Sequence, residues 1–294
     1  MTEPKILGRA GGSLPLRALF VTPEHSKWAF MKRFIPFLKS PPRVAVLRLS
    51  GVIGTGRAPL NDAVLAPVIE RAFRKGKPQA VALIINSPGG SPVQSALIAA
   101  RIRRLSEEKD IPVHAFIEDV AASGGYWLAA AADQIWADYG SIVGSIGVIS
   151  SGFGAHEFIA RHGIERRVYT SVKSKSMLDP FKPETPEDVD RMKEILGDMH
   201  KGFETYVRTR RADRLSDNPD LFTGRVWLGE KAQALGLIDG LAHVEPKLKE
   251  LYGEKVKFLR YGRKRGLLQR FGAQLTQDAL AGIEERAAYA RFGL

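Results

Sequence analysis

A serine in a glycine-rich turn is the first residue of this chain whose type and position could do chemistry. Ser123 lies in Ala-Ala-Ser-Gly-Gly-Tyr, after a predicted strand and at the start of a predicted helix. A serine there commonly caps the helix. It can also act as a nucleophile, with the Gly124 amide close to the oxyanion that forms. Ala121 stands where the nucleophile elbow of α/β-hydrolases has glycine, which argues against that particular arrangement.

A second glycine turn precedes this serine in the chain. Residues 86–90 read Asn-Ser-Pro-Gly-Gly and follow the apolar run Ala-Val-Ala-Leu-Ile-Ile of residues 80–85. Ligands of parallel α/β folds bind at the carboxyl ends of strands, and Gly89 and Gly90 let the backbone approach a ligand closely. A tight strand–helix turn accounts for the same residues, so the motif alone leaves both interpretations open.

A serine nucleophile needs a base, and histidine or lysine can supply it. None of the six histidines lies in a recognisable triad context: they are His25, His114, His156, His162, His200 and His243. A lysine withdrawn from water loses its proton readily and can also serve. The segment 171–176 offers Lys173 and Lys175, and their positions alone do not choose between them.

The elements that must position these turns alternate along the chain. Apolar runs predict strands at 44–49, 80–85, 113–117 and 134–137. Helical patterns cover 61–74, 91–104, 123–132, 185–210 and 228–235, with Asn61 and Thr185 as N-caps. Such alternation predicts an α/β fold with a largely parallel sheet flanked by helices.

Composition excludes several classes of protein. Of the 294 residues, 44% are hydrophobic and 26% are charged, which is incompatible with a mainly disordered chain. Cysteine is absent, so a disulfide scaffold, a thiolate nucleophile and a cysteine zinc site are excluded. No group of side chains has the spacing of metal ligands or of a nucleotide site, and we expect no metal and no cofactor.

The net charge of +12 is concentrated in two flanks. Residues 1–43 hold eight Lys/Arg and two Glu, residues 255–270 hold seven Lys/Arg and no acid, and the body between them is neutral. A neutral body argues against nucleic-acid binding. The charge and the Pro41-Pro42 break predict three parts: a basic flank at 1–42, a central domain at 43–252 and a basic extension at 253–294. We interpret the second basic run as a solvated tail or an inter-subunit arm.

The N-terminal flank holds an amphipathic stretch. In residues 27–39 aromatic and aliphatic side chains fill one half of a helical wheel and basic side chains fill most of the other, although Pro36 interrupts it. This pattern fits an arm docked on protein or a contact with an anionic membrane. No run approaches the roughly 20 apolar residues that span a bilayer, and we find no signal peptide. We therefore expect a cytoplasmic protein, with membrane association through the flank as an open alternative.

Several motifs in order resemble one protein family. After Asn-Ser-Pro-Gly-Gly and Ala-Ser-Gly-Gly-Tyr come Val-Gly-Ser-Ile-Gly-Val at 143–148, Lys-Ser-Met-Leu-Asp-Pro-Phe at 175–181, Gly-Arg-Val-Trp at 224–227 and Gly-Leu-Ile-Asp at 236–239. Together they resemble the signal peptide peptidase A family of serine proteases, in its short single-domain form. The resemblance covers about residues 43–252 and implies a fold of the ClpP/crotonase type, a βαβ superhelix.

The resemblance also implies roles for individual residues. The family uses a Ser–Lys dyad, which carries over to Ser123 as nucleophile and Lys175 as general base. Ser176 stands where the family commonly has Asp, so Lys173 stays open as an alternative base. Ser145 matches the position that hydrogen-bonds the lysine, and Gly90 and Gly124 match the donors of the oxyanion hole.

The activity implied is that of an endopeptidase on short apolar peptides, with released signal peptides as the substrate class. A single-domain member is expected to form a homo-oligomeric ring, in which dyads can be completed between subunits. Two alternatives share the fold: a crotonase-like acyl-CoA enzyme, which needs neither Ser123 nor Lys175, and a non-catalytic scaffold. A ClpP-like triad would have a histidine soon after the serine, and none occurs before His156.

Overall fold

The computed structural model of this chain describes residues 40–54, 60–262 and 286–294. The chain divides into two compact units, Met1–Ser40 and Pro41–Leu294, and the second holds all the described residues except Ser40. The amphipathic stretch predicted at 27–39 lies outside the described residues. No helix of the described part is both long and apolar enough to cross a bilayer.

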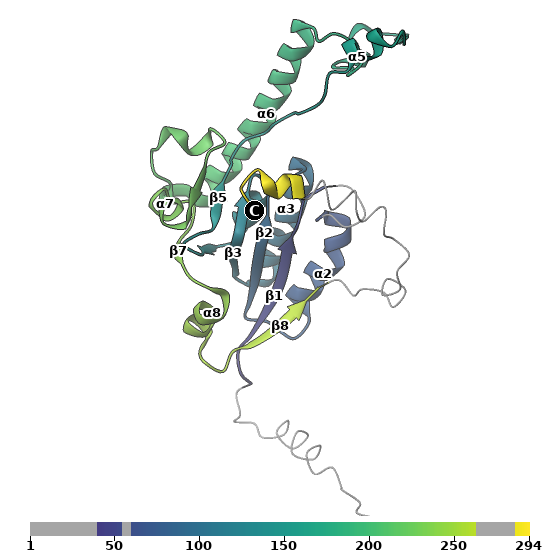
Figure 1. The fold of residues 1–294 in the computed structure, drawn as a ribbon. Helices are drawn as coiled ribbons and strands as arrows, with labels where there is room; N and C mark the ends of the chain where they lie inside the picture. The colour runs from purple at the N-terminus through teal and green to yellow at the C-terminus, as the bar shows by residue number, and fades with distance from the viewer. Residues whose placement is uncertain (1–39, 55–59, 263–285) are drawn as a thin grey trace, which may run out of the picture. The chain divides into compact units, whose positions relative to one another are not determined.

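Within the described residues, eight strands form one sheet in the order β6-β5-β3-β2-β1-β8, with β4 beside β3 and β7 beside β4 (Figure 1). Their bounds are β1 Arg43–Ser50, β2 Ala80–Ser87, β3 Val113–Ala122, β4 Gln134–Ala137, β5 Ile142–Gly144, β6 Val226–Leu228, β7 Gly240–Leu241 and β8 Lys257–Tyr261. The pairings are parallel except that between β5 and β6. The predicted α/β class, with a largely parallel sheet flanked by helices, is confirmed.

Helices and short 3-10 turns connect these strands. The helices between the strands are α2 Asp62–Arg74, α3 Pro92–Lys109, α4 Gly124–Ala129, α5 His156–Arg161, α6 Pro186–Arg211, α7 Gly229–Ala234 and α8 Val244–Tyr252. The 3-10 turns are η2 Lys173–Ser176, η3 Ala212–Arg214 and η4 Pro219–Phe222. Both predicted caps are confirmed: Asn61 accepts a hydrogen bond from the Val64 N–H, and Thr185 accepts one from the Asp188 N–H.

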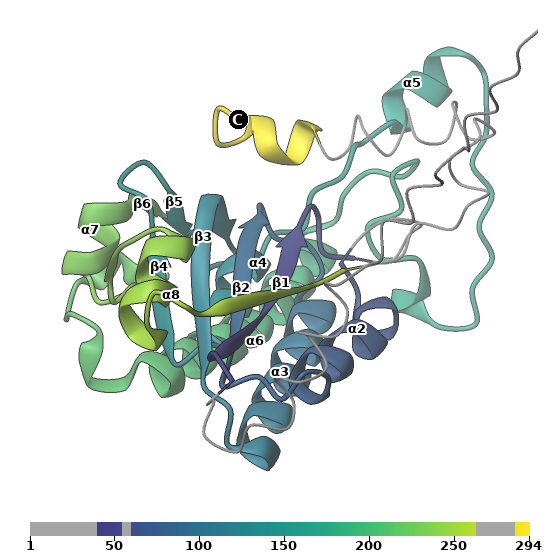
Figure 2. The ribbon, with the colours of Figure 1, turned by 90° about the horizontal axis from the view of Figure 1, so that it is seen from below.

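The sheet is buried on both faces because alternate residues of its central strands are all apolar. On β2, Val81, Leu83 and Ile85 face the larger core, which includes side chains of α2, α3, α4 and α6. Ala82 and Ile84 face the smaller core, together with Leu248 of α8. Figure 2 shows α8 on the opposite side of the sheet from α2, α3 and α6. A strand buried on both faces explains the continuous apolar run in the sequence.

Part of the second basic run belongs to the sheet. Strand β8, Lys257–Tyr261, pairs in parallel with β1, and the Tyr261 hydroxyl donates to the Lys75 carbonyl at 2.5 Å. The interpretation of this run as a solvated tail or an inter-subunit arm is therefore wrong for these residues. Phe258 packs on the smaller core and Tyr261 on the larger core, while Lys257 and Arg260 stay exposed.

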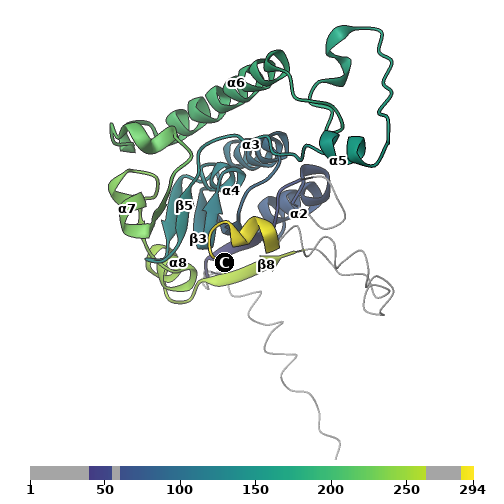
Figure 3. The ribbon, with the colours of Figure 1, turned by 45° about the horizontal axis from the view of Figure 1, so that its top comes forward.

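The segment between β5 and α6 has no core of its own. From 147 to 202 no residue with a described side chain is buried, and α6 buries only Phe203, Val207 and Arg211, all in its last ten residues. We call residues 147–185 the arm. Figures 1 and 3 show α5, which belongs to the arm, near the end of α6 that lies away from α7. The described side chains of the arm therefore form no buried core within the single chain.

Candidate active site

Ser123 is held between β3 and α4 in a conformation that a non-glycine residue rarely adopts. Its φ is 52° and its ψ is −122°. The Ser123 N–H donates to the Gly144 carbonyl at 2.8 Å, and the Ser123 carbonyl accepts from the Trp127 N–H at 3.0 Å. The side chain makes no capping hydrogen bond to α4. Ser123 therefore occupies the N-cap position of α4 but does not cap the helix with its side chain. Strained backbone of this kind clusters at functional sites.

The predicted glycine turn at the end of β2 lies directly against Ser123. A Cβ built on Gly89 would lie 2.9 Å from both the Ser123 Cβ and the Gly124 nitrogen. The turn is secured by Ser87, whose hydroxyl donates to the Gly51 carbonyl at 2.7 Å and accepts from the Gly89 N–H at 3.2 Å. Parallel pairing of β2 with β3 thus brings two motifs together that are more than 30 residues apart.

The position of Gly90 is restricted to glycine by its backbone conformation and by the close approach of Ile53. Its φ is 141°, and a Cβ there would lie 1.9 Å from the Ile53 carbonyl oxygen. The Ile53 N–H donates to the Gly89 carbonyl at 2.8 Å, and the Ser91 N–H donates to the Ile53 carbonyl at 2.7 Å. Backbone therefore packs on backbone at this position, which only glycine allows.

Ser145 follows β5 and shares the unusual backbone of Ser123. Its φ is 50°, and its N–H donates to the Arg225 carbonyl at 2.7 Å. Its neighbour Gly144 is the residue whose carbonyl accepts the Ser123 N–H. Gly90, Ser123, Gly124 and Ser145 thus lie around the carboxyl ends of β2, β3 and β5.

The single chain does not bring Lys175 to this cluster. Lys175 is exposed on η2 in the arm, and its N–H contacts the Val172 carbonyl at 3.3 Å. Within the described residues, no hydrogen bond joins it to Ser123. The backbone of Lys173, the alternative base, lies on the same 3-10 turn. The structure therefore assembles the serine and the glycines but leaves both lysines on the arm.

In the part of the chain that the structure describes, no histidine is hydrogen-bonded to Ser123 either. His114 is buried in the smaller core, where its Nε2 lies 2.7 Å from the Tyr252 hydroxyl, and burial lowers the pKa of this imidazole. His243 pairs with Asp138 at 2.7 Å, and His162 contacts the Phe158 carbonyl. Among the described residues no group of acids and histidines could hold a metal ion.

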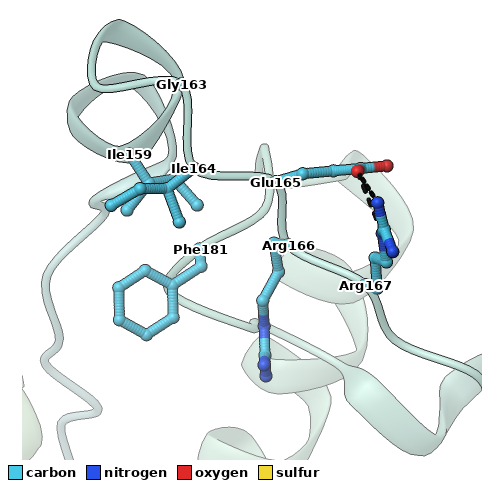
Figure 4. Close-up of a pocket in the computed structure, with 7 residues that line it drawn as sticks. All are labelled: Ile159, Gly163, Ile164, Glu165, Arg166, Arg167 and Phe181. Atoms are coloured by element: carbon cyan, nitrogen blue, oxygen red, sulfur yellow. Dashed lines mark hydrogen bonds and ion pairs between the residues drawn. The ribbon is translucent and has the colours of Figure 1, made fainter.

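One hollow of the described part lies in the arm. Figure 4 shows Ile159, Ile164 and Phe181 around it, with Arg166 beside the phenyl ring. The Arg166 guanidinium carbon lies 5.8 Å from the Phe181 ring centre, and Arg166 pairs with Asp179 at 3.1 Å. The Phe181 N–H and Arg166 both hydrogen-bond the Asp179 carboxyl and hold its pKa below the usual range.

Comparison with known proteins assigns the family. The model of peptidase family S49 matches residues 106–256, a range that includes Ser123, Ser145 and Lys175 and more than half of the chain. This chain belongs to peptidase family S49. Membership confirms the family inferred from the motifs.

Individual relatives cover different shares of the chain. A Brucella abortus protein named Na(+)/H(+) antiporter NhaA is 46% identical over 286 residues, or 90% of this chain. The chloroplastic serine protease SPPA of Arabidopsis thaliana is 30% identical over 75% of the chain, and protease 4 of Haemophilus influenzae is 29% identical over 68%. The chain spans 39%, 34% and 32% of the lengths of these three relatives. The solved structure of a membrane-bound stomatin-specific protease gives a TM-score of 0.48 at 14% identity over 77% of the chain.

Proposed function

We propose that this S49 peptidase is a serine endopeptidase with a Ser–Lys dyad that cleaves short apolar peptides, such as released signal peptides. The observation that carries the proposal is the backbone conformation of Ser123 together with the glycine turn packed against it. Its backbone is strained, its hydroxyl is not used as a cap, and the Gly89–Gly90 turn lies against it. Strain that the surroundings maintain at a potential nucleophile is expected where the side chain must point at a substrate.

Gly90 and Gly124 are the proposed donors of the oxyanion hole. Gly124 is the first residue of α4, so its N–H has no acceptor inside the helix. The Gly124 nitrogen lies beside Gly89, so the two turns adjoin where a substrate carbonyl would sit next to Ser123. Each such donor is typically worth about 3 kcal/mol in the transition state.

The proposed reaction runs through an acyl-enzyme. Neutral Lys175 takes the Ser123 proton as the oxygen attacks the scissile carbonyl, and the negative charge moves to the carbonyl oxygen in the oxyanion hole. The ammonium of Lys175 then gives the proton to the leaving amine, and the C–N bond breaks. A water molecule, deprotonated by the same lysine, hydrolyses the ester and restores Ser123. Ser145 orients the lysine in this scheme.

We propose that Lys175 reaches Ser123 from a neighbouring subunit of a homo-oligomeric ring. The arm that carries Lys175 has no buried residue among its described side chains, and it exposes Phe153 by 93% and Tyr169 by 92%. Large aromatic side chains this exposed, on a segment without a buried core, favour a surface that another subunit covers. A lysine enclosed between subunits is withdrawn from water, which favours the neutral form that a base needs.

Hydrolysis of a fluorogenic apolar peptide between pH 6 and 10 tests the dyad. We expect Ser123→Ala and Lys175→Ala to abolish hydrolysis, while the matched variant Lys173→Ala retains it. Loss in Lys173→Ala with activity left in Lys175→Ala would move the base to Lys173. If oligomeric wild type neither hydrolyses such peptides nor reacts with a fluorophosphonate, the proposal is wrong. Binding of acyl-CoA would then separate the crotonase-like enzyme from the scaffold.

Mixing two inactive variants tests the shared dyad. Equal amounts of Ser123→Ala and Lys175→Ala are unfolded and refolded together. If each site takes its serine and its lysine from different subunits, roughly a quarter of the sites then hold both residues and regain activity. No recovery is possible when both residues come from one subunit. Ser123→Ala refolded alone is the control.

The basic flank at residues 1–42 is a proposed peripheral contact with anionic membrane. Its support is the sequence pattern of residues 27–39. Sedimentation with vesicles that contain anionic lipid tests it, and vesicles of neutral lipid are the control. Equal pelleting with both, or none with either, contradicts the contact.

A further inference from the structure

Both serines of the proposed site are held by hydrogen bonds of their own backbone. Ser123 and Ser145 have φ values of 52° and 50°. A side chain disfavours this region, so each serine would relax if its surroundings allowed it. The Ser123 N–H donates to the Gly144 carbonyl and the Ser145 N–H donates to the Arg225 carbonyl. The backbone conformation of both serines therefore depends on the positions of the Gly144 and Arg225 carbonyl groups.

These two supports lie on an antiparallel strand pair. In the β5–β6 register Val143 faces Trp227 and Gly144 faces Val226, so Arg225 stands one residue before the paired region. Strand β5 also pairs in parallel with the end of β3, with Ala122 opposite Gly144. The strand β5 is thus placed between the strand that delivers Ser123 and the strand that carries Trp227.

The indole of Trp227 packs on Gly144 of β5. Trp227 is 8% exposed. A Cβ built on Gly144 would lie 2.9 Å from Cε3 and Cζ3 of this indole and 2.9 Å from the Arg225 carbonyl oxygen. The ring therefore rests against the Gly144 Cα without room for another atom. Gly144, with a φ of 114°, is held between the indole and the Ser123 N–H that it binds.

We propose that Trp227 is a positioning residue for the nucleophile: its indole fixes Gly144, and the Gly144 carbonyl fixes the Ser123 backbone. The same strand fixes Ser145 through the Arg225 carbonyl. The inference rests on the proposed function in so far as Ser123 is the nucleophile. It assigns a role to the Gly-Arg-Val-Trp motif, which neither the serine nor the glycine turns explain. Trp227 itself touches no reacting atom.

The chain offers a matched control for an indole packed on glycine. A Cβ on Gly240 would lie 2.8 Å from Cζ3 of Trp136, which packs against the smaller core on the face of α8. Trp136 belongs to the same sheet, but its strand β4 pairs with β7 and with the earlier half of β3, away from Ser123. Shortening Trp136 therefore removes a similar contact without touching the supports of the serines.

The experiment compares Trp227→Leu and Trp227→Phe with Trp136→Leu in the full chain. It measures the rate of fluorophosphonate labelling of Ser123, kcat and KM for an apolar peptide, and hydrogen exchange of the peptide that contains Ser123. We expect Trp227→Leu to slow labelling and lower kcat by about tenfold to a hundredfold, since a displacement of about 1 Å can cost about 10²-fold. KM should change little, and exchange at Ser123 should rise. Trp227→Phe, which keeps an aromatic face on Gly144, should restore most of the rate, and Trp136→Leu should leave kcat unchanged.

Two results overturn the inference. One is labelling and exchange of Ser123 at the wild-type rate in Trp227→Leu. The other is an equal loss of kcat in Trp227→Leu and Trp136→Leu, which indicates a general loss of stability. Failure of the proposed function has a different signature, because wild type itself would then be unreactive. The exchange measurement still decides the inference in that case: faster exchange at Ser123 in Trp227→Leu alone supports it, and equal exchange in all variants overturns it.

Discussion

Arg211 is a cation almost completely withdrawn from water. Its side chain is 1% exposed near the end of α6. The guanidinium donates to the Gly236 carbonyl at 2.8 Å and to both oxygens of Asp239 at 2.9 and 3.1 Å. Asp239 also accepts from the Ile135 N–H at 2.7 Å and from Arg214 at 3.1 Å. This network fastens the end of α6, the helix whose start follows the arm.

The perturbation that tests this network is Arg211→Met, which keeps the length and apolar volume but removes the charge. Breaking a buried ion pair by deleting one partner costs about 3–5 kcal/mol. Asp239 keeps Arg214 and the Ile135 N–H, so we expect the lower end, about 3 kcal/mol of unfolding free energy. For a domain of this size that corresponds to a fall in Tm of about 6–12 °C.

Urea and thermal unfolding at pH 7, followed by circular dichroism at one protein concentration, measure the effect. The matched control is Arg104→Met on α3, whose pair with Glu108 at 2.7 Å is half exposed on both sides. An exposed pair of this kind contributes less than about 1 kcal/mol. A loss of less than about 1 kcal/mol in Arg211→Met, or an equal loss in both variants, would refute the argument from burial.

Three further predictions concern the helix cap, the glycine turn and acid stability. Asn61→Ala removes the cap of α2 and should lower the unfolding free energy by about 1 kcal/mol in urea titration, while Asn61→Asp should restore most of it. Gly90→Ala places a Cβ 1.9 Å from the Ile53 carbonyl oxygen at a φ of 141°, so we expect fluorophosphonate labelling of the serine to be lost, and labelling at the wild-type rate would contradict this. Burial would raise the pKa of Asp239, but hydrogen bonds from Arg211 and the Ile135 N–H outweigh it and hold the pKa below its usual value. A carboxyl with a lowered pKa stabilises the fold above the unfolded pKa of about 3.9 and loses this contribution as the pH falls through its folded pKa, so the gap between wild type and Arg211→Met should narrow toward pH 2 in urea titrations.

The elements themselves are predictable because their signals are local. The apolar run at residues 80–85 is long enough for a strand buried on both faces, and it forms most of β2. Asn61 and Thr185 mark helix starts because a side-chain oxygen can satisfy free N–H groups two or three residues later, and both do so here. Each of these signals depends on a few neighbouring residues, so it is legible without knowledge of the fold.

The role of a residue is harder to predict where that role depends on contacts with residues far away in the sequence. Ser123 has the sequence context of a helix cap, and only pairing with Gly144 reveals a strained serine with its hydroxyl free of the helix. The basic composition of residues 255–270 suggests a solvated tail, yet parallel pairing of residues 257–261 with β1 makes them strand β8. Propensity is a weak guide in such cases because backbone pairing and burial against distant residues outweigh local preference.

The assembly of the candidate site and of the buried ion pair depends on contacts between residues that are far apart in the sequence. Residue types and their order were sufficient for the α/β class, the caps and the peptidase family, because these depend on local periodicity and on motifs that survive as short strings. Tertiary structure was needed to bring Gly89 against Ser123, to place Trp227 on Gly144 and to bury Arg211 beside Asp239. Each of these contacts joins residues from 28 to more than 80 positions apart, and at such separations the pairing depends on strand order and register that no local pattern encodes.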